Sequence, residues 1–333
     1  MRQGVGVNAR LSQVALRQGG VFTAQDALQS GYSRDAIRHR VDSGRWTRVG
    51  RGIFAAAGDL PAETLPRVLR ECWTALLAHP DAVVGFGVAA ELNGLDTYRP
   101  LPGLELVRSS AARRTPDLAQ VRVTAAALPA EHVREPRGVP ATSPARTAAD
   151  IARRGTLREG VVVLDSAMRL GCAREELDLM LETCRGWPGI RSLRLALEVA
   201  DQGAESALES LAHVMQREEG IPRPQTQVCI YDAAGLIGRV DDYWAAEATV
   251  GESDGMFKYD EPGSLRREKL RQERLERTGL QVVRVTYADV TRSPAATAQR
   301  YREAFERGGR RLAWRPIAVR TAPSPRLWGQ VAG

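Results

Sequence analysis

The chain has 333 residues, of which 43% are hydrophobic and 26% are charged, so it is long enough for two or three domains with ordinary cores. Its longest apolar run, 82–90, is much shorter than the roughly 20 residues that span a bilayer, which excludes a transmembrane helix. Residues 1–20 show no secretory signal, and the scattered cysteines and histidines exclude a zinc ribbon, a disulfide framework and a His-based metal site. We expect a cytoplasmic protein.

The charge of the chain favours a polyanionic partner. Its net charge is +7 and its isoelectric point is about 9.6, which suits phosphate contacts. Nearly all of the positive charge is arginine, because Lys258 and Lys269 are the only lysines in the chain. An ammonium group is a compact point charge, unlike a guanidinium, so this segment is a candidate for a site that needs one. Chance retention of the two lysines is the alternative.

The N-terminal segment has the spacing of three short helices. Apolar periodicity predicts a helix over 11–18, and Thr23 with Asp26 forms a capping pair for the next helix. Ser33 then caps a third helix, which ends at Gly44, a residue type that commonly follows a helix in the left-handed conformation. This order is that of a helix-turn-helix.

The third helix, 34–43, and the hairpin that follows, 46–54, are both rich in arginine. A basic helix face suits the major groove of DNA, and a basic hairpin suits phosphates or the minor groove. The candidate DNA-binding residues of this segment are Arg34, Arg38, Arg40, Arg45, Arg48 and Arg51. A solvated face on a protein-interaction module is the alternative.

The stretches 19–23, 27–28, 31–33, 44–46 and 51–54 together carry a resemblance to a known family. They resemble the N-terminal winged-helix domain of the AbiEi family, the antitoxins of type IV toxin-antitoxin systems. The resemblance implies DNA binding, often at a promoter, and a toxin as a further partner.

The middle region, 59–203, offers elements but no evident chemistry. The pattern 142–150 resembles the central part of the same antitoxin-like proteins, so a scaffold or partner-binding role is expected. Periodicity predicts a helix over 64–78, strands over 82–85, 104–107 and 121–124, a helix beginning at Pro144, and helices over 157–170, 173–184 and 190–201.

From Ala204 onward the order of elements predicts a mixed sheet flanked by helices. The expected elements are a helix over 206–216, strands over 225–231, 236–244 and 248–253, a helix over 265–277, a strand over 281–286 and a last helix over 288–307.

Acidic residues fall where these strands should converge: Glu209, Asp241, Asp242, Glu252 and Asp254. Carboxylates gathered in this way repel one another unless a hard divalent cation lies between them, and Mg²⁺ prefers such oxygen ligands. A bound Mg²⁺ would activate water and stabilise charge on a phosphodiester, with Lys258 helping to orient the nucleophile. The pattern therefore predicts metal-dependent phosphodiester hydrolysis.

The stretches 206–210, 238–241, 251–255, 258–259, 268–271 and 282–286 resemble the PD-(D/E)XK nuclease superfamily, in its branch similar to very-short-patch-repair endonucleases. The resemblance implies that Glu209, Asp241 and Glu252 are the metal-site carboxylates, with Lys258 as the assisting catalytic group. Lys269 and Arg271 are the corresponding DNA-contact candidates.

Two departures from that superfamily bear on catalysis. Asp254 stands where its E-x-K motif has lysine, so Asp254 would become a further metal ligand or Lys258 would take the lysine's place. Asp242 stands where a large apolar residue is expected, which leaves the choice between Asp241 and Asp242 open. Structural explanations also exist, because Glu209 completes a capping box with Ser206 and the charged helix could be a salt-bridged surface.

The sequence thus predicts an α/β (α+β) protein in four parts: a winged helix-turn-helix over 1–58, an α/β middle region over 59–203, a restriction-endonuclease-like domain over 204–307 and a basic tail over 308–333. The first functional hypothesis is a DNA-binding protein with a Mg-dependent endonuclease domain. The alternative is a non-catalytic, antitoxin-like transcriptional regulator. The expected partners are DNA and either a toxin or a second copy of the chain, with no membrane.

Overall fold

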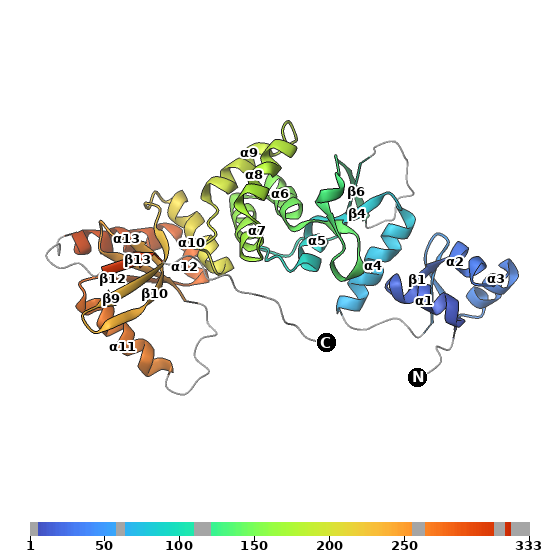
Figure 1. Cartoon of the computed structure of the whole chain (residues 1–333), viewed down its shortest axis with the longest axis horizontal. Coiled ribbons are helices and arrows are strands. Elements are labelled where there is room, and N and C mark those ends of the chain that lie inside the picture. Colours follow the sequence, from blue (N-terminus) through green and yellow to red (C-terminus); the bar gives the residue numbers. More distant parts are fainter. Residues whose placement is uncertain (1–5, 58–63, 110–120, 255–263, 310–316, 321–333) are drawn as a thin grey trace. The chain divides into compact units, whose positions relative to one another are not determined.

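The computed structural model describes residues 6–57, 64–109, 121–254, 264–309 and 317–320, which belong to two compact units (Figure 1). The first unit contains 1–94 and 100–147, and the second contains 95–99 and 148–333. The boundary therefore falls inside helix α6 (Pro144–Arg154). Within the described ranges, no helix is both long and apolar enough to cross a membrane. The finer division into four parts stays a prediction.

The N-terminal part of the first unit has the helix-turn-helix expected from the sequence. Its elements are α1 (Ala9–Arg17), β1 (Val21–Thr23), α2 (Ala24–Gln29), α3 (Arg34–Asp42), β2 (Trp46–Gly50) and β3 (Ile53–Ala56). The Thr23 hydroxyl accepts from the Asp26 amide at 3.0 Å while the Asp26 carboxylate accepts from the Thr23 amide at 2.8 Å, so the capping box is confirmed. Ser33 caps α3, and Gly44 follows it with φ +70°. These local signals set the turn between α2 and α3.

The strands form a three-stranded antiparallel sheet in the order β1-β3-β2, whose first strand was not predicted. One side of this sheet packs against the helices through buried Leu11, Phe22, Ile37 and Trp46. The Phe22 and Trp46 rings meet edge to face with centroids 4.8 Å apart. Burial of these large apolar groups holds the three helices at fixed angles.

Helix α4 (Thr64–Ala78) packs against the same small sheet. Val21 and Ile53 contact Trp73 of α4, and Trp73 also packs into the core of the neighbouring five-stranded sheet. The approach is close, because a Cβ on Gly19 would lie 2.9 Å from an α4 carbonyl oxygen. The winged-helix segment and the rest of the first unit therefore share apolar surface.

The remainder of the first unit is a five-stranded sheet in the order β6-β5-β4-β8-β7. Its strands are β4 (Ala82–Gly85), β5 (Leu104–Arg108), β6 (Val121–Ala125), β7 (Val133–Arg134) and β8 (Ala141–Thr142). The apolar run 82–90 was interpreted only as a strand over its first four residues, but it continues as helix α5 (Phe86–Asn93), which ends at Gly94 with φ +74°.

The second unit begins with a layer of helices close to their expected positions: α7 (Leu157–Arg169), α8 (Arg174–Thr183), α9 (Ile190–Val199) and α10 (Ala207–Glu218). Thr156 and Glu159 form a capping box at the start of α7. The middle of α7 is fully buried from Val161 to Leu164, and α7 packs against both α9 and α10. This contact fixes α10 against the helical layer on one side.

The C-terminal sheet has the order β12-β11-β10-β9-β13 and is mixed, as expected, because β11 and β12 run parallel and the other pairs antiparallel. Its strands are β9 (Gln225–Asp232), β10 (Gly235–Trp244), β11 (Thr249–Ser253), β12 (Gln281–Val285) and β13 (Ile317–Arg320), with helices α11 (Ser264–Arg277), α12 (Tyr287–Arg292) and α13 (Pro294–Gly309). Figure 1 shows α11 and α13 on opposite sides of the sheet, each over its own apolar core.

Two expectations for this region are corrected. The single helix over 288–307 is two helices, because Pro294 lacks the backbone N–H that would continue the first, and the second restarts there. The region predicted as a basic tail outside the domain, 308–333, contributes a strand, β13, paired with β9 of the C-terminal sheet. That pairing satisfies backbone groups that a β9 edge would otherwise present to water. Gly308 and Gly309 end α13, and residues 310–316 and 321–333 lie outside the described ranges.

Candidate functional site

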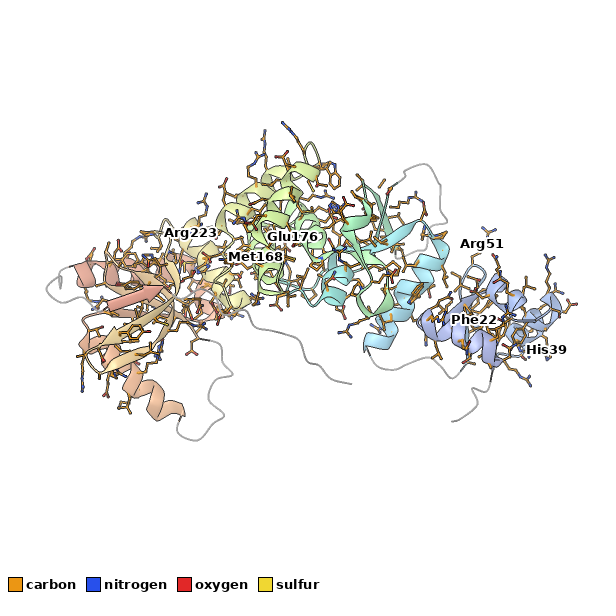
Figure 2. All side chains as sticks on the ribbon, in the orientation of Figure 1. Phe22, His39, Arg51, Met168, Glu176 and Arg223 are labelled. Carbon is orange, nitrogen blue, oxygen red and sulfur yellow. The ribbon has the colours of Figure 1, made fainter. Side chains whose placement is uncertain are left out.

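The helix α3 and the β2–β3 hairpin present a basic surface. Ile37 faces the core, which turns the arginines of α3 outward, and Gly52 turns the hairpin with φ +71°. Figure 2 shows Phe22 inside this small domain, with His39 and Arg51 at its periphery. The exposed arginines are Arg34, Arg38, Arg45, Arg48 and Arg51, five of the six predicted from the sequence.

The sixth, Arg40, has a different environment. Its Cζ lies 4.6 Å from the centroid of the Tyr32 ring and 5.7 Å from that of Trp46, and its Nη1 donates to the Ala36 carbonyl at 3.3 Å. A guanidinium over aromatic rings is held by cation–π attraction and by stacking. Arg40 therefore supports the turn between α2 and α3. The other five are exposed, although the Cζ of Arg48 also lies over a ring, 5.8 Å from the Phe54 centroid.

Asp35 is paired with one arginine of this surface. Asp35 lies 3.8 Å from Arg38, and their side chains are 91% and 75% exposed. An exposed pair at this distance contributes about 0–1 kcal/mol, so a phosphate could replace the carboxylate without a large penalty.

In the second unit, three of the predicted carboxylates lie on neighbouring elements, α10, β10 and β11. The β10–β11 register pairs Asp242 with Gly251, and one further step places Asp241 opposite Glu252. Glu209, in the first turn of α10, is the third: its burial, followed by the charge of Asp241, raises its pKa to about 7. Glu209 thus lies within electrostatic reach of Asp241, and Asp241 and Glu252 occupy opposite positions on neighbouring strands, whereas a single site that gathers all three carboxylates stays a prediction.

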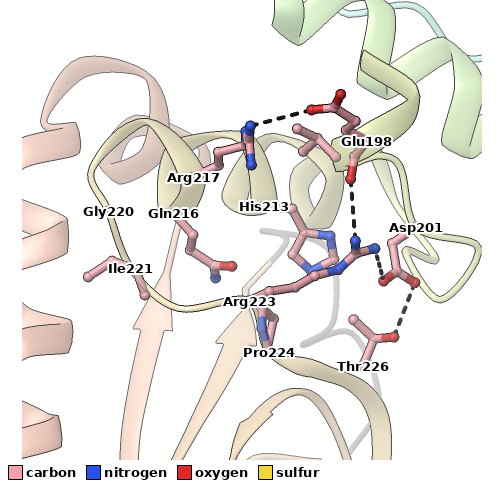
Figure 3. Close-up of a pocket in the computed structure, with 11 residues that line it drawn as sticks. Glu198, Asp201, His213, Gln216, Arg217, Gly220, Ile221, Arg223, Pro224 and Thr226 are labelled. Atoms are coloured by element: carbon pink, nitrogen blue, oxygen red, sulfur yellow. Dashed lines mark hydrogen bonds and ion pairs between the residues drawn. The ribbon is translucent and has the colours of Figure 1, made fainter. Parts of the chain in front are cut away.

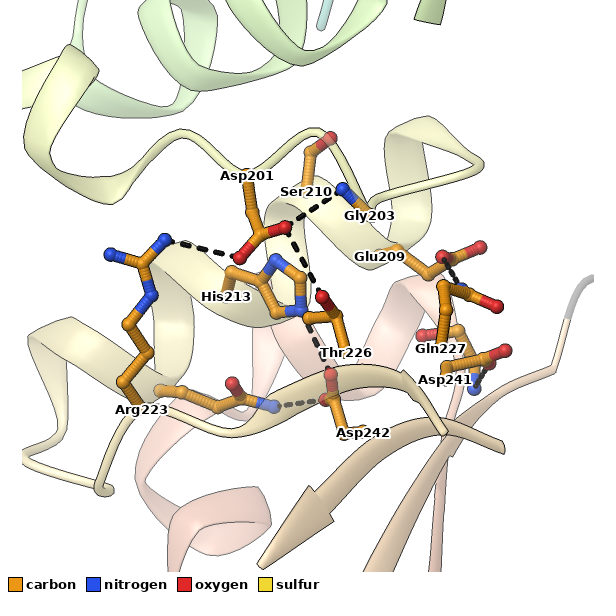
Figure 4. A network of polar contacts seen from close by, with 12 residues as sticks. Asp201, Gly203, Glu209, Ser210, His213, Arg223, Thr226, Gln227, Asp241 and Asp242 are labelled. Atoms are coloured by element: carbon orange, nitrogen blue, oxygen red, sulfur yellow. Dashed lines mark hydrogen bonds and ion pairs between the residues drawn. The ribbon is translucent and has the colours of Figure 1, made fainter. Parts of the chain in front are cut away.

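The partners of Glu209 are those of a helix cap. Its carboxylate accepts from the Glu205 amide at 2.8 Å and from the Ser206 hydroxyl at 2.8 Å. It also accepts from Gln227 Nε2 at 3.1 Å (Figure 4). The Ser206 hydroxyl in turn accepts from the Glu209 amide at 3.2 Å. Gln227 holds φ +53°, a strained backbone conformation for a non-glycine residue.

Glu252 is neutralised by two arginines. Arg271 Nη2 of α11 lies 2.5 Å from its Oε1, and Arg284 Nε of the neighbouring strand lies 3.4 Å from its Oε2. The Glu252 side chain is only 12% exposed, so both guanidinium groups act with little screening by water. Gly238 permits the approach, because a Cβ there would lie 2.6 Å from Arg271 Nε.

The other predicted site residues are arranged as follows. Asp241 Oδ2 accepts from the Ser253 amide at 2.8 Å, and the Asp254 amide donates to the Val285 carbonyl at 2.9 Å. Lys269 is exposed on α11. Lys258 lies outside the described residues.

These contacts do not suit a divalent cation. Across the described ranges, no group of three or more His, Cys, Asp or Glu side chains is placed to hold a metal ion. Both Glu252 oxygens already face guanidinium groups, and Glu209 is engaged by three donors. We derive no chemistry through a metal. The magnesium ion and the catalytic roles of Glu209, Asp241, Glu252 and Lys258 stay predictions.

A buried polar network beside these carboxylates was not foreseen. His213 Nε2 lies 2.9 Å from Asp242 Oδ1, and Gln216 Nε2 donates to Asp242 Oδ2 at 2.8 Å (Figure 4). Burial alone would lower the pKa of His213, but Asp242 outweighs it and raises the pKa to about 9. Burial raises the pKa of Asp165, which accepts from the Asp201 amide at 2.8 Å, to about 7. The structure therefore explains Asp242 as the partner of His213. The sequence did contain one signal for such a buried partner, because Asp242 stands where a large apolar strand residue was expected.

The N-terminal fold, with its capped recognition helix and basic hairpin, is of the winged-helix class found in DNA-binding regulators. Residues 9–57 match the family model described as a transcriptional regulator, AbiEi antitoxin, and residues 82–215 match that of the AbiEi antitoxin C-terminal domain. The chain belongs to the AbiEi antitoxin family.

Relatives are found in Mycobacterium tuberculosis. The chain is 30% identical to the uncharacterized protein Rv2248 over 276 residues, which cover 83% of this chain and 98% of that protein. The protein MT2308 of another strain matches equally. The crystal structure of the RV2827C protein aligns with a TM-score of 0.40 and 20% identity, over 65% of this chain and 82% of that one.

Proposed function

We propose that the protein is a DNA-binding transcriptional regulator that acts as an antitoxin. The supporting observation is the set of exposed arginines on α3 and the hairpin, within a segment that matches the regulator model. In this proposal α3 enters the major groove, where Arg34 and Arg38 reach base edges and phosphates. Arg48 and Arg51 on the hairpin contact the adjacent backbone or minor groove.

The arginines in this proposal have different roles. Those at the surface supply phosphate contacts, which give affinity that falls with salt. Arg40, held over Tyr32 and Trp46, keeps α3 at the angle that the groove requires. A toxin or a second copy of the chain is a further proposed partner, in keeping with the family.

The test uses the full chain and duplex DNA from upstream of its own coding sequence, with affinity measured by fluorescence anisotropy over a range of salt concentrations. Arg38→Ala combined with Arg48→Ala should lower affinity by about tenfold or more and reduce the slope of log K against log salt by about 2. The matched control is Arg191→Ala with Arg194→Ala, which removes two exposed arginines from α9 in the second unit. Unchanged affinity and slope in the first variant would remove the functional basis of the basic surface.

The endonuclease interpretation stays a prediction, and the contacts of the described carboxylates favour the regulator. Incubation of the protein with supercoiled and linear DNA, with and without Mg²⁺ or Mn²⁺, distinguishes the two. We expect binding without cleavage. Metal-dependent cleavage that disappears in an Asp241→Ala, Glu252→Ala variant would instead establish the enzyme.

A further inference from the structure

Asp35 is an acidic residue on the surface that we propose for DNA. It is the second residue of α3, directly after the Ser33 cap. It stands three residues before Arg38, which puts both side chains on one face of the helix, while Ile37 faces the core. In helix-turn-helix proteins the N-terminal residues of the recognition helix contact the base edges. Asp35 and Arg38 therefore lie on the part of α3 that would meet the bases.

The Asp35 carboxylate is open to solvent and loosely held. Its side chain is 91% exposed, and its described ion-pair partner, Arg38, lies 3.8 Å away. An aspartate with a structural role has different surroundings. Asp201 of the second unit is 12% exposed and accepts from Arg223 at 3.1 Å and from the Thr226 hydroxyl at 3.2 Å (Figure 3). Asp35 therefore retains acceptor capacity for a donor outside the chain.

A free carboxylate is unfavourable on a surface that binds phosphates. Asp35 lowers the positive potential around Arg34 and Arg38, and the phosphate backbone of DNA offers it only further acceptors. A carboxylate in the first turn does favour the helix dipole. That role is independent of the DNA sequence, so base preference is the property that distinguishes it from contact with a base.

The donors that base pairs present in the major groove are the amino groups of cytosine N4 and adenine N6. A carboxylate only accepts, and the N7 acceptor beside the adenine amino group repels it, so cytosine is the better partner. A guanidinium is complementary to O6 and N7 of guanine. Neighbouring bases along a strand are about 3.4 Å apart, close to the 3.8 Å between Asp35 and Arg38.

We propose that Asp35 and Arg38 read a cytosine and a guanine in neighbouring base pairs of the DNA site. Asp35 accepts from cytosine N4, and Arg38 donates to guanine O6 and N7. The exposed pair that the two side chains form without DNA separates at little cost. This inference rests on the proposed function and deepens it, because it names the bases that α3 recognises.

The test is selection by the full chain from a duplex DNA library with a randomised central segment, followed by sequencing of the bound fraction. We expect the wild-type chain to enrich a site with cytosine and guanine in neighbouring base pairs. Asp35→Ala should lose the cytosine preference, keep the guanine preference and bind random DNA at least as tightly as the wild type. Asp35→Asn should move the preference from cytosine to adenine, because an amide matches adenine N6 and N7.

The matched control is Asp42→Asn, which removes the same charge from the exposed last residue of α3 and should leave every base preference unchanged. Fluorescence anisotropy on the selected duplex gives the magnitude. Replacing the C·G pair by T·A, which puts an acceptor in place of the amino group, should weaken wild-type binding by about fivefold or more. The same replacement should weaken binding of Asp35→Ala by less than about twofold.

The possible outcomes separate this inference from the proposed function. If the wild type and Asp35→Ala enrich the same motif and differ only by a uniform gain in affinity, the inference is overturned and the helix dipole is the role of Asp35. A base other than cytosine at the position that depends on Asp35, or wild-type binding without sequence preference, would also overturn it. Absence of DNA binding by the wild type and all variants would instead remove the proposed function, and this inference with it.

Discussion

The two ends of this chain use arginine in opposite ways. On α3 and the hairpin, five arginines extend into solvent, and the one described acidic partner, Asp35, is a weak one. In the C-terminal sheet, Arg271 and Arg284 both contact Glu252, which is largely buried. Guanidinium groups in the first arrangement remain available to phosphate, whereas those in the second hold strands and a helix together. The same residue type therefore indicates binding in one region and structure in the other.

The largest effect is expected from a substitution that breaks the buried polar network of the C-terminal region. Asp242→Ala leaves the His213 charge buried without its partner, and we expect it to lower the free energy of unfolding by about 3–5 kcal/mol. Urea unfolding followed by circular dichroism measures the loss. The matched control is Asp42→Ala on α3, where the carboxylate is exposed and stability should not change. Equal stability of both variants would show that the His213–Asp242 pair is dispensable.

Raising the pH should lower the melting temperature. The pKa of Asp165 rises from its ordinary 3.8 to about 7 through burial, and that of Glu209 rises from 4.5 to about 7 through burial and Asp241. Each group stabilises the fold fully when the pH is below the pKa that the group has in the unfolded chain. This contribution is lost as the pH rises through the folded pKa of about 7. His213 loses its contribution between its ordinary 6.5 and its folded value of about 9.

All three groups therefore act in one direction, and scanning calorimetry should show a fall of roughly 5 °C or more between about pH 5 and pH 9. Asp165→Asn should flatten the part of the profile between about pH 4 and pH 7, and it should narrow the His213 part without removing it, because the Asp165 charge helps Asp242 to raise the pKa of His213. A melting temperature that rises over this range would contradict the assignment.

A smaller loss of stability is expected from substitution of Arg40, which is held against two aromatic rings of the N-terminal domain. Arg40→Ala removes the contacts with Tyr32 and Trp46 and should lower stability by about 1 kcal/mol. Arg34→Ala, at an exposed position on the same helix, should leave stability unchanged and weaken only DNA binding. Thermal unfolding and DNA binding of the two variants, measured side by side, test this division; equal losses of stability would refute it.

The smallest expected effect is that of divalent metal. Because Arg271 and Arg284 already neutralise Glu252, about 5 mM Mg²⁺ at constant ionic strength should change the melting temperature by less than about 1 °C. A metal that bound the native state well would raise it by several degrees, and that result would favour the endonuclease interpretation.

The helix-turn-helix was predictable because its determinants are local. Thr23 with Asp26, Ser33 and Gly44 each act within one turn of their own position, so spacing in the sequence is sufficient. The positions of Asp241 and Glu252 on adjoining strands were predictable for a related reason, since the strand order limits which residues can face each other. The gathering of Glu209, Asp241 and Glu252 at one metal site stays a prediction.

The partners of those carboxylates were not predictable. Arg271 meets Glu252 across 19 positions, and His213 meets Asp242 across 29, and no periodicity links such residues. The sequence pattern shows which charges exist, but only packing determines whether a carboxylate faces a metal ion, a guanidinium or an imidazole. Helix α5 was overlooked because a short apolar run fits a strand and a helix equally well.

The packing of α4 on the small N-terminal sheet determines how short a fragment can be. Cutting the chain after residue 57 would leave Val21, Ile53 and Ala55 facing water, because their cover is Trp73 and its neighbours on α4. Such a fragment should precipitate or self-associate although every arginine of the proposed DNA-binding surface is present. A fragment that ended after α4 would still expose to water the side of Trp73 that packs into the core of the five-stranded sheet. NMR mapping of the proposed DNA-binding surface therefore calls for the full chain, because the first unit ends inside α6.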